Sequence, residues 1–230
     1  MKTTILVSIF LFMCLSLCAA LENEDPAWVY RGRGERLYRK GEVGKAIVEY
    51  KKAIAARTRE NGEGIYPEVN LRLSEIYLTE GLYDLAMLHV TRAEQQRDDL
   101  EIPETIFDVL YKKAEILFKL KRYNETIAVY DSIIKEDENW KFYSRQSPYT
   151  LFEGTVADPE LQKKFGRAYL EVGRLKFLSK NYDNAIPYLK MAILYGYKRE
   201  ESLNLLINCF ISLDNRNLAE KAKSLYSSNS

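Results

Sequence analysis

The fold is decided by a short polar turn that leads directly into a helix, Lys40-Gly41-Glu42-Val43-Gly44-Lys45-Ala46-Ile47. The same pattern returns as Glu80-Gly81-Leu82-Tyr83-Asp84-Leu85-Ala86-Met87, Lys121-Arg122-Tyr123-Asn124-Glu125-Thr126-Ile127 and Lys180-Asn181-Tyr182-Asp183-Asn184-Ala185-Ile186. A weaker fifth copy is Asp214-Asn215-Arg216-Asn217-Leu218-Ala219-Glu220-Lys221-Ala222. Internal self-similarity of this kind is the sequence signature of a repeat protein.

Apolar residues at helical spacing lie on both sides of each turn. Leu73, Ile76 and Tyr77 precede the second turn, and Ala86 and Val90 follow it. Spacings of three, four and seven residues indicate amphipathic helices. The sequence therefore predicts nine or ten helices, arranged in pairs. Because one pair cannot bury its own apolar face, neighbouring pairs must stack around a continuous core.

The positions of small residues resemble those of the tetratricopeptide repeat (TPR) family. Three sites recur: early in the second helix of each pair, seven residues later in that helix, and in the first helix. They are Ala46, Ala86, Thr126 and Ala185; Ala53, Ala93, Ile133 and Ala192; and Gly34, Ser74, Ala114 and Gly173. Small residues are needed where two helices cross closely. The resemblance implies an all-α, right-handed superhelical α-solenoid of antiparallel helix pairs, about four to five repeats over residues 27–230.

The repeat spacing predicts an insert near the middle of the chain. The early small site recurs after 40, 40 and 59 residues, whereas the simple family period is about 34. The largest excess places an aromatic-rich insert at about 138–157, with Trp140, Phe142, Tyr143, Tyr149 and Phe152. Long loops are usually functional or disordered, and this aromatic density argues against disorder. We expect the insert to pack on the stack as a plug or lip; whether it contacts a ligand stays open.

The N-terminal residues have the pattern of an export signal. Lys2 precedes an apolar run of thirteen residues, Ile5 to Leu17, whereas a membrane-spanning helix needs about 20. Residues 1–20 are therefore predicted to be a secretory signal peptide, followed by a short linker at 21–26. We expect the protein to be exported to the periplasm or cell envelope.

Two cleavage sites fit this leader. Leu15-Ser16-Leu17-Cys18 resembles a bacterial lipobox, which implies lipidation of Cys18 and membrane anchoring. Leu17 departs from that pattern, because the family normally has Gly, Ala or Ser there. The alternative is ordinary cleavage after Ala20, which would release a soluble exported protein.

Composition argues against several classes of function. The 34 basic and 33 acidic residues nearly cancel, so nucleic acid and an anionic membrane surface are not expected partners, and membrane contact is expected only through the N-terminal lipid. Cys209 alone remains in the folded part and cannot form an internal disulfide. One histidine, His89, excludes a histidine-based metal cluster. With no phosphate loop or nucleophile motif either, we predict no enzyme activity and no cofactor.

The resemblance also implies a binding face. In this family, ligands dock on the first helix of each repeat, on the concave side. The alignment carries this face over as two rows: Glu35, Glu75, Glu115 and Arg174; and, three residues on, Tyr38, Leu78, Phe118 and Phe177. Because the first row is mostly Glu, we predict no clamp for a C-terminal carboxylate.

Both rows also have a structural explanation. Glu35 could pair with Arg39, and Glu115 with Lys119, at an i, i+4 spacing that contributes about 0.2–0.5 kcal/mol. A narrow superhelix could simply bury the apolar row. His89 is placed on the outward side of its helix, where replacement should cost little.

Two candidate functions are consistent with these features. The leading hypothesis is an exported scaffold or adaptor, lipid-anchored if Cys18 is acylated, that holds a protein or peptide partner from an envelope or membrane complex in its concave groove. The alternative is a small-molecule-binding or transporter-accessory subunit whose aromatic insert caps a pocket.

Overall fold

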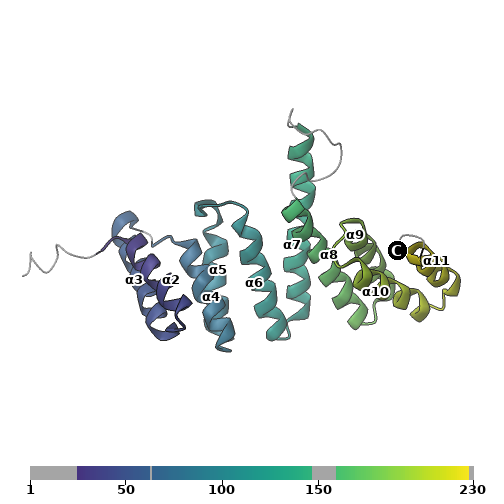
Figure 1. Ribbon diagram of the computed structural model, residues 1–230, viewed down its shortest axis with the longest axis horizontal. Helices are drawn as coiled ribbons and strands as arrows, with labels where there is room; N and C mark the ends of the chain where they lie inside the picture. Colours follow the sequence, from purple (N-terminus) through teal and green to yellow (C-terminus); the bar gives the residue numbers. More distant parts are fainter. Residues whose placement is uncertain (1–24, 63, 147–158, 228–230) are drawn as a thin grey trace, which may run out of the picture.

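The computed structural model describes residues 25–62, 64–146 and 159–227, and within these it contains ten α-helices, one short 3-10 helix and no strand. The helices are α2 (Ala27–Arg39), α3 (Val43–Asn61), α4 (Pro67–Thr79), α5 (Tyr83–Gln95), η1 (Arg97–Asp99), α6 (Thr105–Lys119), α7 (Tyr123–Gln146), α8 (Pro159–Leu178), α9 (Tyr182–Leu194), α10 (Arg199–Ser212) and α11 (Arg216–Ser227). They stand side by side in chain order along one elongated stack (Figure 1). The predicted all-α solenoid is confirmed.

Five helix pairs share one turn. In each pair, the residue that follows the C-cap of the first helix has a left-handed backbone conformation. The N–H of the residue after it donates to a carbonyl five residues earlier in the chain. Those bonds are Glu42 N to Leu37 O (3.0 Å), Leu82 N to Tyr77 O (2.8 Å), Arg122 N to Leu117 O (2.9 Å), Asn181 N to Lys176 O (2.9 Å) and Asn215 N to Phe210 O (2.8 Å). This is the Schellman motif, which satisfies carbonyls at a helix end. The weak fifth sequence copy is therefore a complete helix pair.

Within each pair, small residues let the helices cross closely. Ala46 and Ala86 are fully buried. A Cβ added to Gly34 would lie 2.7 Å from the ring of Tyr50, and one added to Gly173 would lie 2.7 Å from Leu189. The large side chain on the second helix thus fills the space that a small residue leaves on the first.

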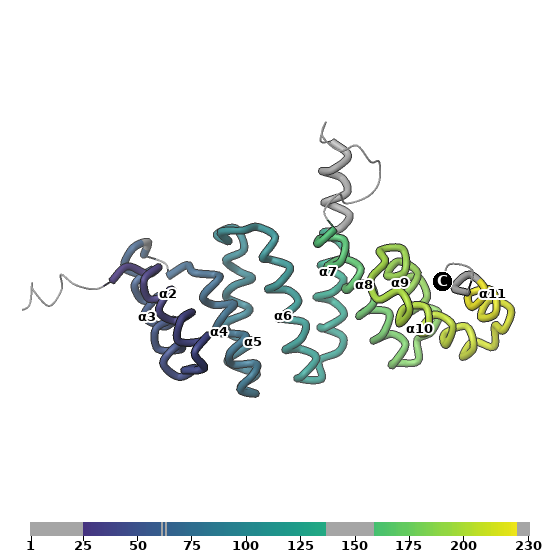
Figure 2. Tube along the Cα trace, in the orientation of Figure 1, coloured from purple at the N-terminus to yellow at the C-terminus, as the bar shows by residue number. Residues whose placement is uncertain are grey.

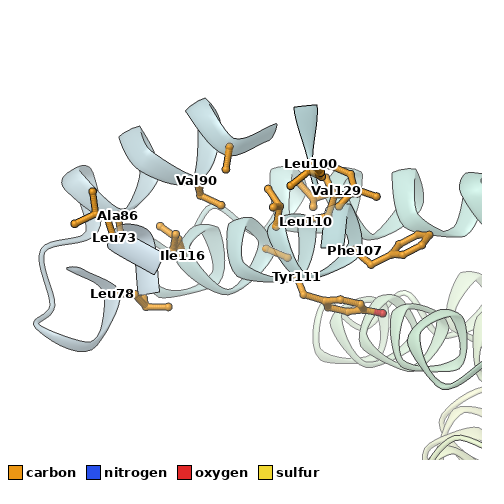
Figure 3. Close-up of a cluster of buried hydrophobic side chains, with 14 of the residues drawn as sticks. Leu73, Leu78, Ala86, Val90, Leu100, Phe107, Leu110, Tyr111, Ile116 and Val129 are labelled. Atoms are coloured by element: carbon orange, nitrogen blue, oxygen red, sulfur yellow. The ribbon is translucent and has the colours of Figure 1, made fainter. Parts of the chain in front are cut away.

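Stacking of the pairs makes the core continuous. Leu73 from α4, Val90 from α5, Phe107 from α6 and Val129 from α7 converge in one cluster (Figure 3). A second cluster begins on α8 and runs through α11. The repeats follow one another in chain order from one end of the stack to the other (Figure 2). The core is therefore built between helices that are neighbours in the chain.

The extra residues between repeats mainly lengthen helices. α3 has 19 residues and α7 has 24, compared with 13 in α2, α4, α5 and α9. The prediction of a non-helical insert from 138 is wrong for its first part, because α7 continues to Gln146 and extends beyond the ends of its neighbours (Figure 1). No Gly or Pro occurs between Tyr123 and Pro148 to stop the helix earlier.

Several sequence predictions lie outside the described residues. These are the signal peptide at 1–20, Cys18 and most of the linker at 21–26. Trp140, Phe142 and Tyr143 lie within α7, whereas Tyr149 and Phe152 lie in the segment 147–158. The predicted plug or lip therefore stays a prediction. None of the described helices combines the length and apolar character needed to cross a membrane.

His89 lies in the core, so its predicted outward placement is wrong. It is 7 % exposed, and its ring stacks on Tyr77 with centroids 5.4 Å apart. The correct repeat register explains this position, because His89 is three residues after the buried Ala86 and next to the buried Val90.

A hydrogen-bond network fixes the state of this histidine. The Asn70 side-chain nitrogen donates to the Tyr66 carbonyl (3.3 Å) and to Gln96 Oε1 (3.2 Å), and Asn70 Oδ1 lies 2.9 Å from His89 Nδ1. Since Asn70 Oδ1 can only accept, the His89 Nδ1 must carry the proton. Burial, with the nearby charges of Arg92 and Lys51, lowers the pKa of His89 to about 4.

The helix crossing yields the first prediction. Gly173→Ala should lower the free energy of unfolding by about 1–3 kcal/mol, because the new methyl group collides with Leu189. Gly32→Ala is the matched control, since a Cβ there meets nothing within 4 Å, and it should raise stability by about 0.5–1 kcal/mol through helix propensity. Urea unfolding midpoints compare the two. Equal effects would mean that the crossing is not tightly packed.

The second prediction concerns pH. Because the pKa of His89 is about 4 in the folded protein and 6.5 in its ordinary, unperturbed state, the unfolded chain takes up the proton first as pH falls. The stabilising effect of the neutral imidazole is therefore complete above about pH 6.5 and is lost as pH falls toward 4.

Over this range the wild type should lose about 2 kcal/mol more stability than His89→Gln. Urea midpoints of both proteins near pH 7 and near pH 4.5 measure the difference, and carboxylate titration cancels in the comparison. Parallel pH profiles for the two proteins would contradict the prediction.

Candidate partner-binding face

The candidate site is the surface formed by the first helices of the pairs, α2, α4, α6, α8 and α10, here called the first-helix face. α4 touches α6 across it, and α8 touches α10. The polar row predicted from sequence lies on these helices. Its members have different ion-pair partners in the N-terminal, middle and C-terminal parts of the stack.

At the N-terminal end, the face is closed by ion pairs. Arg72 on α4 donates to Glu35 on α2 (3.0 Å) and to Glu75 on its own helix, and its guanidinium lies 5.5 Å from the centre of the Tyr38 ring. Arg31 pairs with Glu101 at 2.6 Å. The depression between α2 and α4 measures about 190 Å³. Both of its arginines, Arg31 and Arg72, are paired within the protein.

These contacts correct two predicted ion pairs. Glu35 pairs with Arg72 across the helix interface and not with Arg39. Glu115 pairs with Lys112 at 2.9 Å and not with Lys119. The partner of Glu35 comes from the neighbouring helix, and the partner of Glu115 comes from the preceding turn of the same helix. Neither position is the residue four places later that the sequence spacing predicted.

The apolar row does not form a continuous exposed ladder. Leu78 is 9 % exposed and belongs to the core, whereas Phe118 is 45 % exposed. Phe118 packs edge-on against Tyr123, and Phe177 packs in the same way against Tyr182, with centroids 5.5 and 5.4 Å apart. Both phenylalanines lie near the C-terminus of the first helix of their pair, and their rings pack against the first residue of the second helix.

The C-terminal end of the face contains a depression between α8 and α10. It measures about 530 Å³. Its lining combines apolar side chains with amides and charges, namely Arg174, Phe177, Leu178, Glu200, Glu201, Asn204, Leu205 and Asn208. Two predicted residues, Arg174 and Phe177, therefore come together at this site, here called the α8–α10 depression.

Charge in the α8–α10 depression is weakly acidic. Arg174 donates to Glu171 at 3.2 Å and to Glu201, which also pairs with Lys198 at 3.4 Å. Arg174 is therefore occupied by two carboxylates. Glu200 is exposed and forms no ion pair among the described residues. Within this lining, a ligand meets a free carboxylate and no unpaired cation.

Two asparagines give the depression unused hydrogen-bonding groups. Asn204 and Asn208 are exposed, lie one helical turn apart on α10, and bond to no other described side chain. Each amide offers both donors and an acceptor. Residues at this spacing have Cβ atoms about 5–6 Å apart, which is close to the distance of about 6.6 Å between alternate residues of an extended chain.

The contribution of α10 was not predicted from the sequence. The first-row residue stands six positions before the left-handed turn residue in every pair, as Glu35 does before Gly41 and Arg174 before Lys180. The same offset from Asp214 gives Asn208. The sequence therefore contained the spacing that identifies Asn208, but the fifth copy of the turn was too weak for the polar row to be extended to it.

Other reactive groups are few in the described part of the chain. The Cys209 thiol is buried, and burial raises its pKa to about 11. It is structural by position, within the core of the last pairs. Among the described residues, no group of three or more His, Cys, Asp or Glu side chains could hold a metal ion.

Comparison with known proteins supports the repeat assignment. Residues 107–139, which cover most of α6 and the first part of α7, match the family model of the tetratricopeptide repeat. Among curated proteins, no sequence match is found. The sequence match to the family model therefore covers one repeat of the chain.

Solved structures share the fold over most of the chain. The apo form of RapI matches with a TM-score of 0.62 and 15% identity, covering 88% of this chain and 71% of RapI. MamA from Desulfovibrio magneticus RS-1 gives 0.58 and 16%, covering 89% and 95%. YrrB, a TPR protein with an unusual peptide-binding site, gives 0.56 and 16%, covering 90% and 87%. At these identities the likeness shows the fold alone.

Proposed function

Starting from a chain that carries a tetratricopeptide repeat and folds as a TPR-type solenoid, we propose that this protein is an exported scaffold that binds a segment of a protein partner in the α8–α10 depression. It acts by binding and not by catalysis. The observation that carries the proposal is the combination, in one depression of about 530 Å³, of apolar side chains and free amides.

The chemistry of the depression selects an extended peptide segment. Asn204 and Asn208 can hydrogen-bond the backbone of two alternate residues, because the spacing of their side chains matches that of an extended chain. Phe177, Leu178 and Leu205 provide an apolar contact for a side chain between them. Glu200 favours a basic residue at the rim. The partner segment therefore contains an apolar anchor and a neighbouring Lys or Arg.

The other end of the first-helix face is a poorer site. Binding a charged partner between α2 and α4 would require breaking the pairs of Arg72 with Glu35 and Glu75. Removing one partner from a matched pair leaves a charge without its hydrogen bonds, which is costly. The C-terminal depression requires no such rearrangement of its apolar and amide groups.

A small-molecule function has less support. Small-molecule pockets bury most of their ligand and are lined mainly by apolar and aromatic groups. The α8–α10 depression has one aromatic side chain, Phe177, and a rim residue, Leu178, that is 65% exposed. This is the geometry of a surface contact with a larger partner. The YrrB structure shows that a TPR protein of this fold can have a peptide-binding site.

Export and anchoring complete the proposal. The apolar run from Ile5 to Leu17 and the lipobox-like Leu15-Ser16-Leu17-Cys18 support export followed by acylation of Cys18. The lipid would place the scaffold at a membrane of the cell envelope, where its partner would be an envelope or membrane protein.

The binding site can be tested by photocrosslinking in cells. A photoreactive residue at Asn208 should crosslink to a partner, because it faces the depression. The same residue at Lys190, exposed on α9, should not capture that partner. Mass spectrometry of the Asn208 adduct identifies the partner and the contacted segment. Identical adducts from both positions would contradict a specific site.

With that segment as a synthetic peptide, Phe177→Ala should weaken binding about tenfold, since the ring contributes to the apolar contact. Phe118→Ala is the matched control. It removes the same edge-on contact with the following tyrosine, but it lies outside the α8–α10 depression. Isothermal titration should show unchanged affinity for Phe118→Ala. Equal loss in both variants would assign the effect to folding.

The anchor is tested separately. Acyl chains contribute about 0.8 kcal/mol per buried methylene, so an acylated Cys18 should hold the protein in membranes. Radiolabelled fatty acid should enter the wild type and not Cys18→Ser, and only the wild type should partition with detergent. Recovery of both proteins in the aqueous phase would favour cleavage after Ala20.

A further inference from the structure

Charge is distributed very unevenly along the stack. The first repeat, residues 27–61, contains ten basic and four acidic residues, a net charge of +6. The second, residues 67–101, contains three basic and eight acidic residues, a net charge of −5. The balanced total of the chain conceals this separation, so the absence of a basic surface inferred from composition holds only as an average.

Half of the basic residues of the first repeat belong to α2 and its C-terminal cap, and the other half belong to α3. Trp28, Arg33, Arg36, Arg39 and Lys40 are all exposed, and together they are called the basic stripe. At about 100° per residue, Trp28, Arg36 and Arg39 fall within about 80° of one another. The buried residues of α2, Ala27 and Gly34, lie on the opposite side. As the first helix of the stack, α2 has no preceding repeat among the described residues to cover this side.

Most of the stripe is not neutralised. Among the described residues, no carboxylate pairs with Arg36, Arg39 or Lys40. Arg33 pairs with Asp25 at 2.6 Å. The only acidic residue of α2, Glu35, is within about 40° of Trp28 and Arg39 around the helix, and it is held by Arg72 of α4. Lys40 interacts electrostatically with Glu42, so the stripe presents two cations, Arg36 and Arg39, for which the described residues provide no ion pair.

Trp28 gives the stripe an apolar anchor. It is 71 % exposed at the start of α2, within the same sector as Arg36 and Arg39. A Trp side chain combines a large apolar ring with one N–H donor, so it suits a boundary between an apolar phase and water. Trp favours the interface between lipid head groups and acyl chains, where its ring is partly buried and its N–H stays solvated.

We infer that the basic stripe of α2 docks on an anionic phospholipid surface, with Trp28 inserted at the head-group level. The chain before α2 supports this occupant, because the apolar run ends at Leu17, eleven residues before Trp28. Eleven residues span at most about 40 Å, so a leader or lipid held in a membrane keeps the stripe within reach of that membrane. Each basic residue near an anionic surface contributes on the order of 1 kcal/mol.

A second copy of the chain is the main competing occupant, since the acidic second repeat of one molecule could face the stripe of another. The membrane is favoured because Trp28 needs an apolar environment and because the attached N-terminal segment is itself apolar. Docking in this manner rests on the proposed membrane attachment and deepens it. Its test uses chains with Cys18→Ser, so that a failure of acylation and a failure of the stripe are distinguished.

The experiment measures partitioning of the full chain onto two kinds of vesicle, one of phosphatidylcholine alone and one of equal parts phosphatidylcholine and phosphatidylglycerol. All proteins carry Cys18→Ser. The stripe variant adds Arg36→Gln, Arg39→Gln and Lys40→Gln. The control variant adds Lys119→Gln, Lys190→Gln and Lys221→Gln, which removes the same charge from exposed positions elsewhere.

The preference for phosphatidylglycerol should fall at least about tenfold in the stripe variant and less than about twofold in the control. Insertion of the apolar leader by itself would be the same for both vesicles and cancels in this ratio. Unfolding midpoints of both variants should equal that of the parent. Equal loss of preference in the two variants would overturn the proposal in favour of net charge alone.

Trp28 reports its own position. The chain has two tryptophans, so Trp140→Phe leaves Trp28 as the single emitter. Its emission should move to shorter wavelength on phosphatidylglycerol vesicles and stay unchanged with the stripe substitutions added. An unshifted spectrum of vesicle-bound parent would overturn the proposal. So would a stripe variant that loses self-association in sedimentation velocity while keeping its vesicle preference, since that result assigns the stripe to a second copy.

Discussion

The close crossing of two helices within each repeat is the constraint on which the rest of the structure depends. The Tyr50 ring occupies the space that a side chain on Gly34 would need, and Leu189 does the same at Gly173. Such contact is possible only if the turn between the helices holds them in one register. The repeated Schellman turn provides that register, because it fixes the last carbonyls of the first helix and the direction of the second.

This constraint also determines where binding groups can be placed. The second helix of each pair uses its small and apolar residues for the crossing, while the first helix keeps one side free of the core. Along that side, the N-terminal half is closed by the ion pairs of Arg72, and the C-terminal half is open between α8 and α10. Because each repeat touches mainly its neighbours, these two regions can differ in chemistry without disturbing the shared scaffold.

The repeat pattern made the scaffold predictable from sequence, but not the partners of individual side chains. Ala86 and Ala185 are fully buried as their repeat positions require. The outward placement of His89 came from a wrong assignment of the repeat register, and the acceptor that makes its burial possible, Asn70, lies on another helix. Glu35 likewise finds Arg72 through a helix interface that sequence spacing does not encode. Asn208 could have been found by carrying the row one repeat further.

Charge shows why a repeat protein has to be considered repeat by repeat. A net charge of +1 for the whole chain indicates nothing about α2, because screening limits each surface charge to an effective range of about 8–10 Å at moderate salt. The helices stand side by side along the stack (Figure 1), with about 8–10 Å between packed neighbours, so a partner at α2 is influenced by the nearest repeats and hardly by the C-terminal ones. Part of the opposite charge of the first two repeats is paired across their interface, as in Arg31–Glu101 and Arg72–Glu35, whereas Arg36 and Arg39 form no ion pair among the described residues. In an elongated stack, each end can have its own electrostatic character, and the total is only a property of the composition.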